Sequence, residues 1–198
     1  MKAGIYILAP IGGPAGQRLL ELQQKYDPKL AASAPPHVTL AGSSGLGPLP
    51  RLAVSTLRRA LEPIARTTAP MTLDLGPPMR FMQTDIIVFP MDPHGPLREL
   101  HERIGQCGLP FTPTRHRYTP HCTLNYYQTL TPERRRELLA VRIEGPVRID
   151  RIECHYTAHP QTRLMLELPL TGDSDAVAAA AAAHRASSRR PAGRARKP

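Results

Sequence analysis

The chain has 198 residues, of which 41% are hydrophobic, so it is long and apolar enough to form one domain or two small lobes, and wholesale disorder is excluded. Its 23 prolines favour short elements over long helices, and its net charge of +10 favours polyanionic partners such as nucleic acids. Its three cysteines stand far apart, which argues against a disulfide framework or a cysteine-rich zinc site.

Hydrophobic periodicity and Pro/Gly punctuation predict alternating strands and helices along residues 1–171. The expected strands are residues 4–9, 37–41, 71–75, 85–89, a run within 118–127, 147–157 and 163–170. The expected helices are residues 14–26, 52–65, 96–104 and 132–140. The remaining residues, 172–198, are rich in Ala and Arg and carry +4 of the net charge, and we expect a disordered tail there.

The order of elements repeats along the chain. A strand, a Pro/Gly turn, a helix, a proline and a His-x-Thr-Leu segment occur at residues 4–40 and again at 85–124. The turn and helix text is also similar, GPAGQRLLELQQ beside GPLRELHERIGQ. An internal duplication is therefore plausible, and it predicts two lobes related by a pseudo-two-fold axis.

The repeated segments are Pro-His-Val-Thr-Leu at residues 36–40 and Pro-His-Cys-Thr-Leu at residues 120–124. Composition alone predicts roughly 0.01 copies of Pro-His-x-Thr-Leu in such a chain, so two copies at equivalent places favour a functional role. A bare His-x-Thr is weak evidence, and a third copy, at residues 155–157, lacks the flanking Pro and Leu. We interpret His155 as structural or peripheral.

This spacing suits chemistry on a phosphodiester. In a strand, residues i and i+2 share a face, so His37 lies with Thr39 and His121 with Thr123, while Cys122 faces the core as a small hydrophobe. If the repeats pack about a two-fold axis, two imidazoles and two hydroxyls converge on one cleft. One imidazole can take a proton from water, the other can protonate a leaving oxygen, and the hydroxyls can hold phosphate oxygens. Neither motif contains a carboxylate, so neither a metal site nor a cofactor is expected.

The paired segments resemble the signature motifs of the 2H phosphoesterase superfamily, in particular its 2'-5' RNA ligase-like, or RNA 2',3'-cyclic phosphodiesterase, branch. The resemblance covers roughly residues 1–170. It implies a bilobal α+β fold with two antiparallel sheets and flanking helices around a central cleft. It also implies metal-free opening of a 2',3'-cyclic phosphate to a 2'-phosphate. His37 and His121 would be the acid–base pair, with His121 as the base, and Thr39 and Thr123 would hold the phosphate.

Further substrate contacts are expected around these motifs. The resemblance favours Tyr126, shortly after the second motif, as a residue lining the phosphate or nucleoside site, although an ordinary strand aromatic fits equally well. Arg115 and Arg117 could guide an RNA backbone, or lie in a solvated loop. Phe81 or Tyr118 could stack on a base.

His101, on a helix with glutamates nearby, is expected at the surface. The expected partners are RNA ends or small cyclic nucleotides. The N-terminal apolar run ends at Pro10 and is too short to span a membrane, so we expect a cytoplasmic monomer without membrane partners. The same residues leave open a nucleotide-independent 2'-5' RNA ligase, or a non-catalytic RNA-binding module on this fold.

Overall fold

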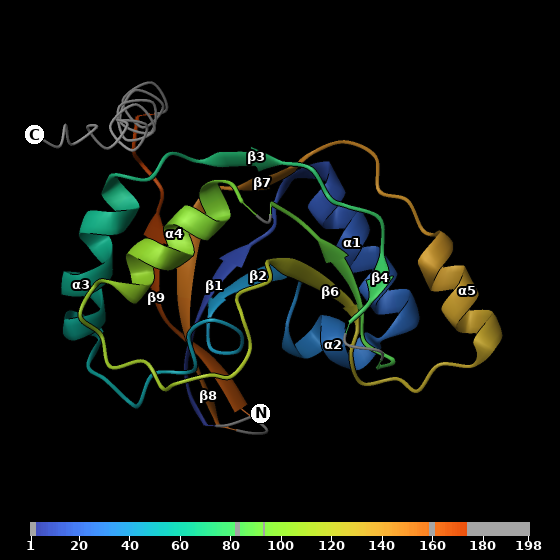
Figure 1. Ribbon diagram of the computed structural model, residues 1–198, viewed down its shortest axis with the longest axis horizontal. Coiled ribbons are helices and arrows are strands. Elements are labelled where there is room, and N and C mark those ends of the chain that lie inside the picture. The colour runs from blue at the N-terminus through green and yellow to red at the C-terminus, as the bar shows by residue number, and fades with distance from the viewer. Residues whose placement is uncertain (1–2, 82–83, 93, 159–160, 174–198) are drawn as a thin grey trace, which may run out of the picture.

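Two antiparallel sheets of unequal size form the framework of the protein (Figure 1). The computed structural model describes residues 3–81, 84–92, 94–158 and 161–173. Within these residues the larger sheet has the strand order β4-β5-β6-β2-β1-β8-β9, and the smaller sheet pairs β3 with β7. The strands are β1 (Gly4–Pro10), β2 (His37–Ala41), β3 (Met71–Leu73), β4 (Met79–Arg80), β5 (Ile87–Pro90), β6 (His121–Asn125), β7 (Val147–Ile149), β8 (Arg151–Ala158) and β9 (Gln161–Pro169). The α+β class with two antiparallel sheets is as predicted, although one sheet is far larger.

All of the helices in the described residues except α3 begin where the sequence places proline in a first turn. A proline at the first or second helical position opens α1, α2, α4 and α5, where its missing N–H leaves no hydrogen bond unmade. The helices are α1 (Gly13–Tyr26), α2 (Pro28–Ser33), α3 (Val54–Arg66), α4 (Pro96–Gly105) and α5 (Pro132–Ala140). Sequence patterns missed α2 and β4, which are six and two residues long.

The prediction of one strand over residues 147–157 is wrong. The chain breaks at Asp150, so that β7 joins the small sheet and β8 pairs with β1 in the large one. The physical reason lies in the apolar pattern: Val147 and Ile149 are buried before the break, whereas Ile152 and Cys154 are buried after it. A continuous strand cannot bury odd and even positions on one face, so the change of phase requires a break.

The predicted duplication is visible in the strand pairing. β1 pairs with β2 as β5 pairs with β6, and each pair has an irregularity at the corresponding place, beside Ile7 and beside Ile87. Pro10 lies opposite His37, and Pro90 lies opposite His121. The two halves meet where β2 pairs with β6 at Val38 and Cys122. This pairing lies at the centre of the large sheet and relates the halves by a pseudo-two-fold axis.

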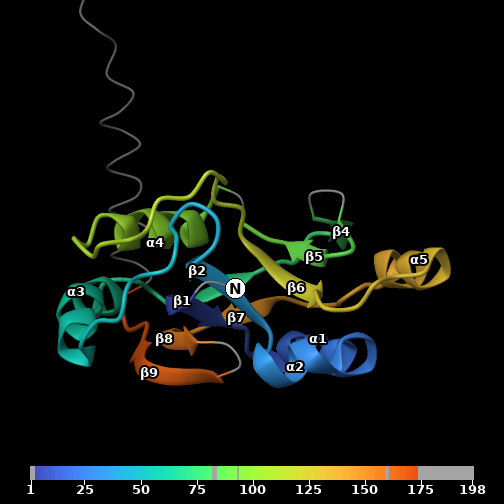
Figure 2. The same cartoon turned by 90° about the horizontal axis from the view of Figure 1, so that it is seen from below.

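Each half sends a helix to the central strand of the other half. α1 contacts β6, and α4 contacts β2; Figure 2 shows α4 on one side of these strands and α1 and α2 on the other. The side-chain Nε2 of Gln23 donates to the Thr123 carbonyl at 2.7 Å, and the Nδ1 of His101 lies 2.7 Å from the Leu40 carbonyl. His101 is therefore not at the surface as predicted, but 7% exposed. Its polar ring is accommodated because it caps a carbonyl that would otherwise be buried without a partner.

The C-terminal strand leads back to α3 at the limit of the described residues. Thr171 and Gly172 donate backbone hydrogen bonds to the carbonyls of Ala65 and Thr68. From residue 174 on, the predicted tail lies outside the described residues. None of the helices in the described part of the chain combines the length and the apolar character needed to cross a bilayer.

Candidate active site

The two Pro-His-x-Thr-Leu segments form the central strands β2 and β6, and their side chains alternate between two environments. His37 and Thr39 are half-buried on one face of β2, whereas Val38 and Leu40 are fully buried on the other. β6 has the same pattern: His121 and Thr123 are half-buried, and Cys122 and Leu124 are fully buried. The apolar residues anchor each strand in the core and leave one imidazole and one hydroxyl from each motif on the accessible face.

The pairing of β2 with β6 brings these four polar residues together. Val38 lies opposite Cys122 in antiparallel register. Extending that register places His37 opposite Thr123 and Thr39 opposite His121, all on one face. The two histidines are then diagonal neighbours, for which the Cα separation is about 7–8 Å. Two imidazole side chains that start from such a spacing can flank a single phosphorus atom.

Each imidazole is held by the backbone two residues before it. The Nδ1 of His37 lies 2.7 Å from the Pro35 carbonyl, and the Nδ1 of His121 lies 2.6 Å from the Thr119 carbonyl. A carbonyl oxygen can only accept, so Nδ1 carries the hydrogen in both rings. The Nε2 atom of each ring is thereby left for the substrate, as a base when neutral and as an acid when protonated.

Both rings have a lowered pKa. Burial lowers the pKa of His121, and the hydrogen bond to Thr119 opposes the effect. Burial is also the main cause that lowers the pKa of His37. The Pro35 carbonyl opposes it, repulsion from the imidazoles of His155 and His121 lowers the pKa further, and the Glu153 carboxylate raises it. The neutral imidazole is therefore the resting form of both rings at pH 7, and a bound phosphate anion would favour protonation of one of them.

The cysteine inside the second motif is not a nucleophile. Cys122 is fully buried on the core face, and burial raises the pKa of its thiol to about 12. Such a thiol stays protonated near neutrality, whereas the thiolate is the reactive form. Cys122 packs in the core beneath the histidine face, as the sequence predicted.

Aromatic rings lie beside the site. The Phe81 ring lies 4.7 Å from the His121 ring, measured between centroids and tilted by 34°, so Phe81 flanks one histidine. Tyr126 follows β6, and 46% of its surface is exposed. Burial is the main cause that raises the pKa of Tyr6, and the nearby Tyr126 phenol raises it further. Tyr118 is buried and stacks on His101 at 3.7 Å, so the ring that was expected to stack on a base is already used inside the protein.

The basic pair that precedes the second motif lies on an exposed loop. Arg115 and Arg117 are both solvent-exposed, and the carbonyl of the intervening His116 accepts from the backbone of Gly45. The loop leads into the start of β6, so it stands at the His121 end of the site. Contact between either guanidinium and the histidines is not required for a role in attracting a phosphate backbone at longer range.

Sequence reasoning missed two carboxylates near the site. Asp27, fully buried, accepts from the backbone of Tyr126 and Tyr127 and so holds the end of β6. Glu153 lies opposite Leu8, which lies opposite Thr39, so its carboxylate is in line with the second residue of the first motif pair, and it lies 2.7 Å from the Nε2 of His155. The spacing of Glu153 and His155, two apart on a strand, was the available signal. Among the described residues, no three His, Cys, Asp or Glu side chains come together as a metal site would need.

Comparisons with known proteins concern the family of the chain and its fold. The family model of the 2'-5' RNA ligase superfamily matches residues 13–160. A search of curated proteins gave no match. E. coli LigT complexed with 3'-AMP is 17% identical at a TM-score of 0.53, with 85% of this chain and 98% of LigT covered. E. coli LigT in its apo form is 15% identical at a TM-score of 0.55, over the same shares. A crystal structure described as a phosphoesterase is 15% identical at 0.54, with 86% and 99% covered. At these identities the likeness to the solved structures concerns the fold.

Proposed function

Because the chain belongs to the 2'-5' RNA ligase superfamily of 2H phosphoesterases, we propose that it opens RNA 2',3'-cyclic phosphate ends to 2'-phosphates without a metal. The observation that carries this proposal is the single face of β2 and β6 that holds His37, Thr39, His121 and Thr123. Two general acid–base groups and two hydroxyl donors around one phosphorus suffice for hydrolysis of a strained cyclic diester.

The proposed reaction adds one water molecule across one P–O bond. Nε2 of His121 takes a proton from water as the water oxygen attacks phosphorus. The P–O3' bond breaks, and Nε2 of His37, protonated at the start, gives its proton to O3'. The product is a 2'-phosphate with a free 3'-hydroxyl, and the proton on His121 returns to His37 through solvent. Thr39 and Thr123 donate to the non-bridging oxygens, where negative charge gathers.

The remaining candidates bind the substrate in this proposal. Tyr126 lines the nucleoside from the end of β6, where its ring is exposed and its backbone is fixed by Asp27. Arg115 and Arg117 attract the RNA backbone from the loop at the His121 end. These roles are tested by their effect on KM, because residues that only hold the substrate leave the chemical step itself largely intact.

A single assay tests the reaction. RNA with a terminal 2',3'-cyclic phosphate is incubated with the protein in the presence of EDTA, and the product is identified as a 2'-phosphate or a 3'-phosphate. Replacing either catalytic group, His37→Ala or His121→Ala, should lower kcat about 10²- to 10⁴-fold, the usual contribution of a general acid or base. His94→Ala is the matched control, since His94 is exposed and plays no part in the site.

Circular dichroism of each variant separates loss of catalysis from loss of fold. Turnover that depends on added metal, or that survives either histidine substitution in a folded protein, would count against the proposal. Ligation is the second candidate, because the matching family is described as 2'-5' RNA ligases and the same four residues serve both directions. It is distinguished by supplying a 5'-hydroxyl acceptor strand and looking for a 2'-5' linkage.

A further inference from the structure

An edge strand of the large sheet brings an aromatic side chain to the second motif. β4 lies at the edge of the sheet, where Met79 is opposite Val88, which is itself opposite Thr123. Directly opposed residues share a face, so Met79 belongs to the face that carries the motif hydroxyls. The backbone N of Phe81 donates to the Ile86 carbonyl at 2.8 Å, so the pairing continues past β4. Phe81, two residues after Met79, therefore lies on the same face.

The Phe81 ring contacts the imidazole of His121 directly. The two ring centroids are 4.7 Å apart, and the ring planes are tilted by 34°. This separation lies in the range of about 4.5–7 Å over which aromatic rings attract one another. Both side chains are half-buried, so the phenyl ring shields one side of the imidazole from water while the site stays accessible.

The contact supplies a restraint that the backbone alone does not give. Nδ1 of His121 lies 2.6 Å from the Thr119 carbonyl, and this hydrogen bond fixes one atom of the ring. Because hydrogen bonds tolerate a wide range of angles, the ring plane could still tilt about that point. The Phe81 ring limits the tilt from the side. The two restraints together fix the direction of Nε2.

A threonine at the following turn holds Phe81 in place. The Oγ1 of Thr84 donates to the Phe81 carbonyl at 2.6 Å and accepts from the backbone N of Ile86 at 3.1 Å. The backbone N of Thr84 donates to the same Phe81 carbonyl at 3.0 Å, and Nε of Arg80 donates to the Thr84 carbonyl at 3.0 Å. Since β4 has only two residues and lies at a sheet edge, these turn bonds are what keep Phe81 in register.

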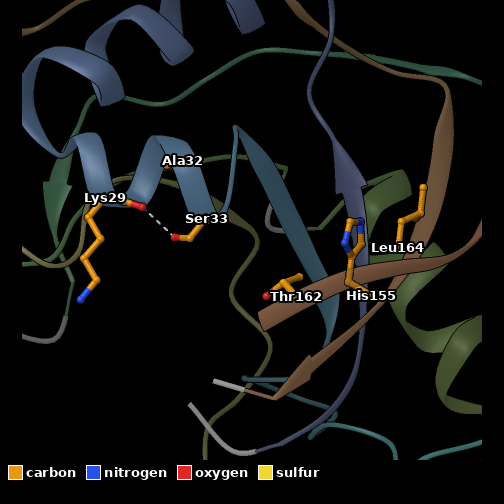
Figure 3. Close-up of a pocket in the computed structure, with 6 residues that line it drawn as sticks. All are labelled: Lys29, Ala32, Ser33, His155, Thr162 and Leu164. Carbon is orange, nitrogen blue, oxygen red and sulfur yellow. Dashed lines mark hydrogen bonds between the residues drawn. The ribbon is translucent and has the colours of Figure 1, made fainter. Parts of the chain in front are cut away.

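The corresponding position in the other half of the protein carries a polar ring. His155 on β8 and Phe81 on β4 each lie two residues beyond the partner of an equivalent position, Leu8 in β1 and Val88 in β5. Nε2 of His155 lies 2.7 Å from the Glu153 carboxylate, and Figure 3 shows His155 lining an open pocket of about 530 Å³. The duplication has therefore placed an apolar ring in the half of the second motif and an imidazole in the half of the first.

This asymmetry suits the two roles in the proposed reaction. The imidazole that takes a proton from water must be neutral when the substrate arrives, whereas the imidazole at the leaving oxygen must be protonated. Apolar surface against an imidazole disfavours its charged form. We propose that Phe81 is a positioning residue for the general base: it holds the neutral His121 ring with Nε2 directed at the substrate. This inference rests on the proposed function.

The kinetic test compares Phe81→Ala with Met79→Ala, which removes a 48% exposed apolar side chain from the same face of β4. Phe81→Ala should lower kcat about tenfold and leave KM within about twofold, because a misplacement of about 1 Å can cost up to about 10²-fold in rate. Phe81→Leu keeps apolar cover on the imidazole and should retain about a third or more of kcat. Met79→Ala should keep both wild-type values.

A substrate without a base distinguishes positioning of His121 from stacking on a nucleobase. The 2',3'-cyclic phosphate of methyl riboside contains the reacting diester but no base. If Phe81 positions His121, Phe81→Ala lowers kcat by the same factor for this substrate and for a 2',3'-cyclic nucleotide. A loss confined to the KM of the nucleotide would overturn the inference and assign Phe81 to base stacking.

NMR titration of the histidine resonances supplies a readout that does not depend on turnover. In Phe81→Ala, His121 should titrate at a higher pH, closer to the ordinary 6.5, because water regains access to its ring. Thr84→Val removes both Oγ1 bonds at an exposed position and should change kcat and the His121 titration in the same direction by a smaller amount. The resonance of His155 is the internal control and should keep its titration in both variants.

The titration also separates failure of this inference from failure of the proposed function. If the wild-type protein hydrolyses none of the cyclic substrates, the proposed function fails, and the titration still decides whether Phe81 controls the His121 ring. An unchanged His121 titration in folded Phe81→Ala protein would overturn the inference in either case.

Discussion

Removing the carboxylate of Asp27 should destabilise the protein far more than an ordinary polar substitution. Oδ1 accepts from the backbone N of Leu30 at 3.1 Å, which caps α2. Oδ2 accepts from the backbone N of Tyr126 at 2.8 Å and of Tyr127 at 2.7 Å, which ties α2 to the end of β6. The side chain is fully buried, so water cannot replace these bonds once they are lost.

The expected magnitude follows from these three acceptor contacts. Hydrogen bonds to a charged group contribute about 1.5–3 kcal/mol each and are not additive, so Asp27→Ala should lower the free energy of unfolding by about 4 kcal/mol. Asp27→Asn keeps one acceptor oxygen and should cost about 1–2 kcal/mol. Urea unfolding followed by circular dichroism gives both values, and the exposed Asp74→Ala should stay within about 0.5 kcal/mol of wild type. A cost below about 1 kcal/mol for Asp27→Ala, or one no larger than that of Asp27→Asn, would refute the reasoning.

Three further predictions concern buried histidines and thiols. Burial is the main cause that lowers the pKa of His37, His101 and His121 below 6.5, so the unfolded chain binds more protons than the folded chain. The free energy of unfolding should therefore fall as pH drops below about 6.5. Thermal unfolding across that range checks this, and a flat profile would contradict it. His101→Gln should retain the bond to the β2 carbonyl and cost less than about 1 kcal/mol, whereas His101→Ala should cost about 2–3 kcal/mol in urea unfolding. Cys122 and Cys154, whose thiol pKa values burial raises to about 12, should resist alkylation in the native state and react on unfolding, as mass spectrometry would detect.

The local pattern of the sequence determined the framework of the site. The strand over residues 37–41 and the helix over residues 132–140 have the predicted bounds. Alternation within the two motifs predicted which side chains share a face, because strand geometry fixes that relation between neighbours two apart. The phase change around Asp150 was present in the same pattern, but the sequence analysis predicted one continuous strand there and so missed the break.

Only the tertiary structure decided which distant residues meet. The pairing of Val38 with Cys122 sets His37 opposite Thr123, and the β1–β8 register sets Glu153 opposite Leu8, which itself lies opposite Thr39. Asp27 reaches the end of β6 across about a hundred residues of chain. The sequence by itself settled the two motifs and the face each presents, since these follow from backbone periodicity over a few residues. The partners depended on sheet register and helix docking, which are set by packing among residues remote in the chain and leave no local periodic signal.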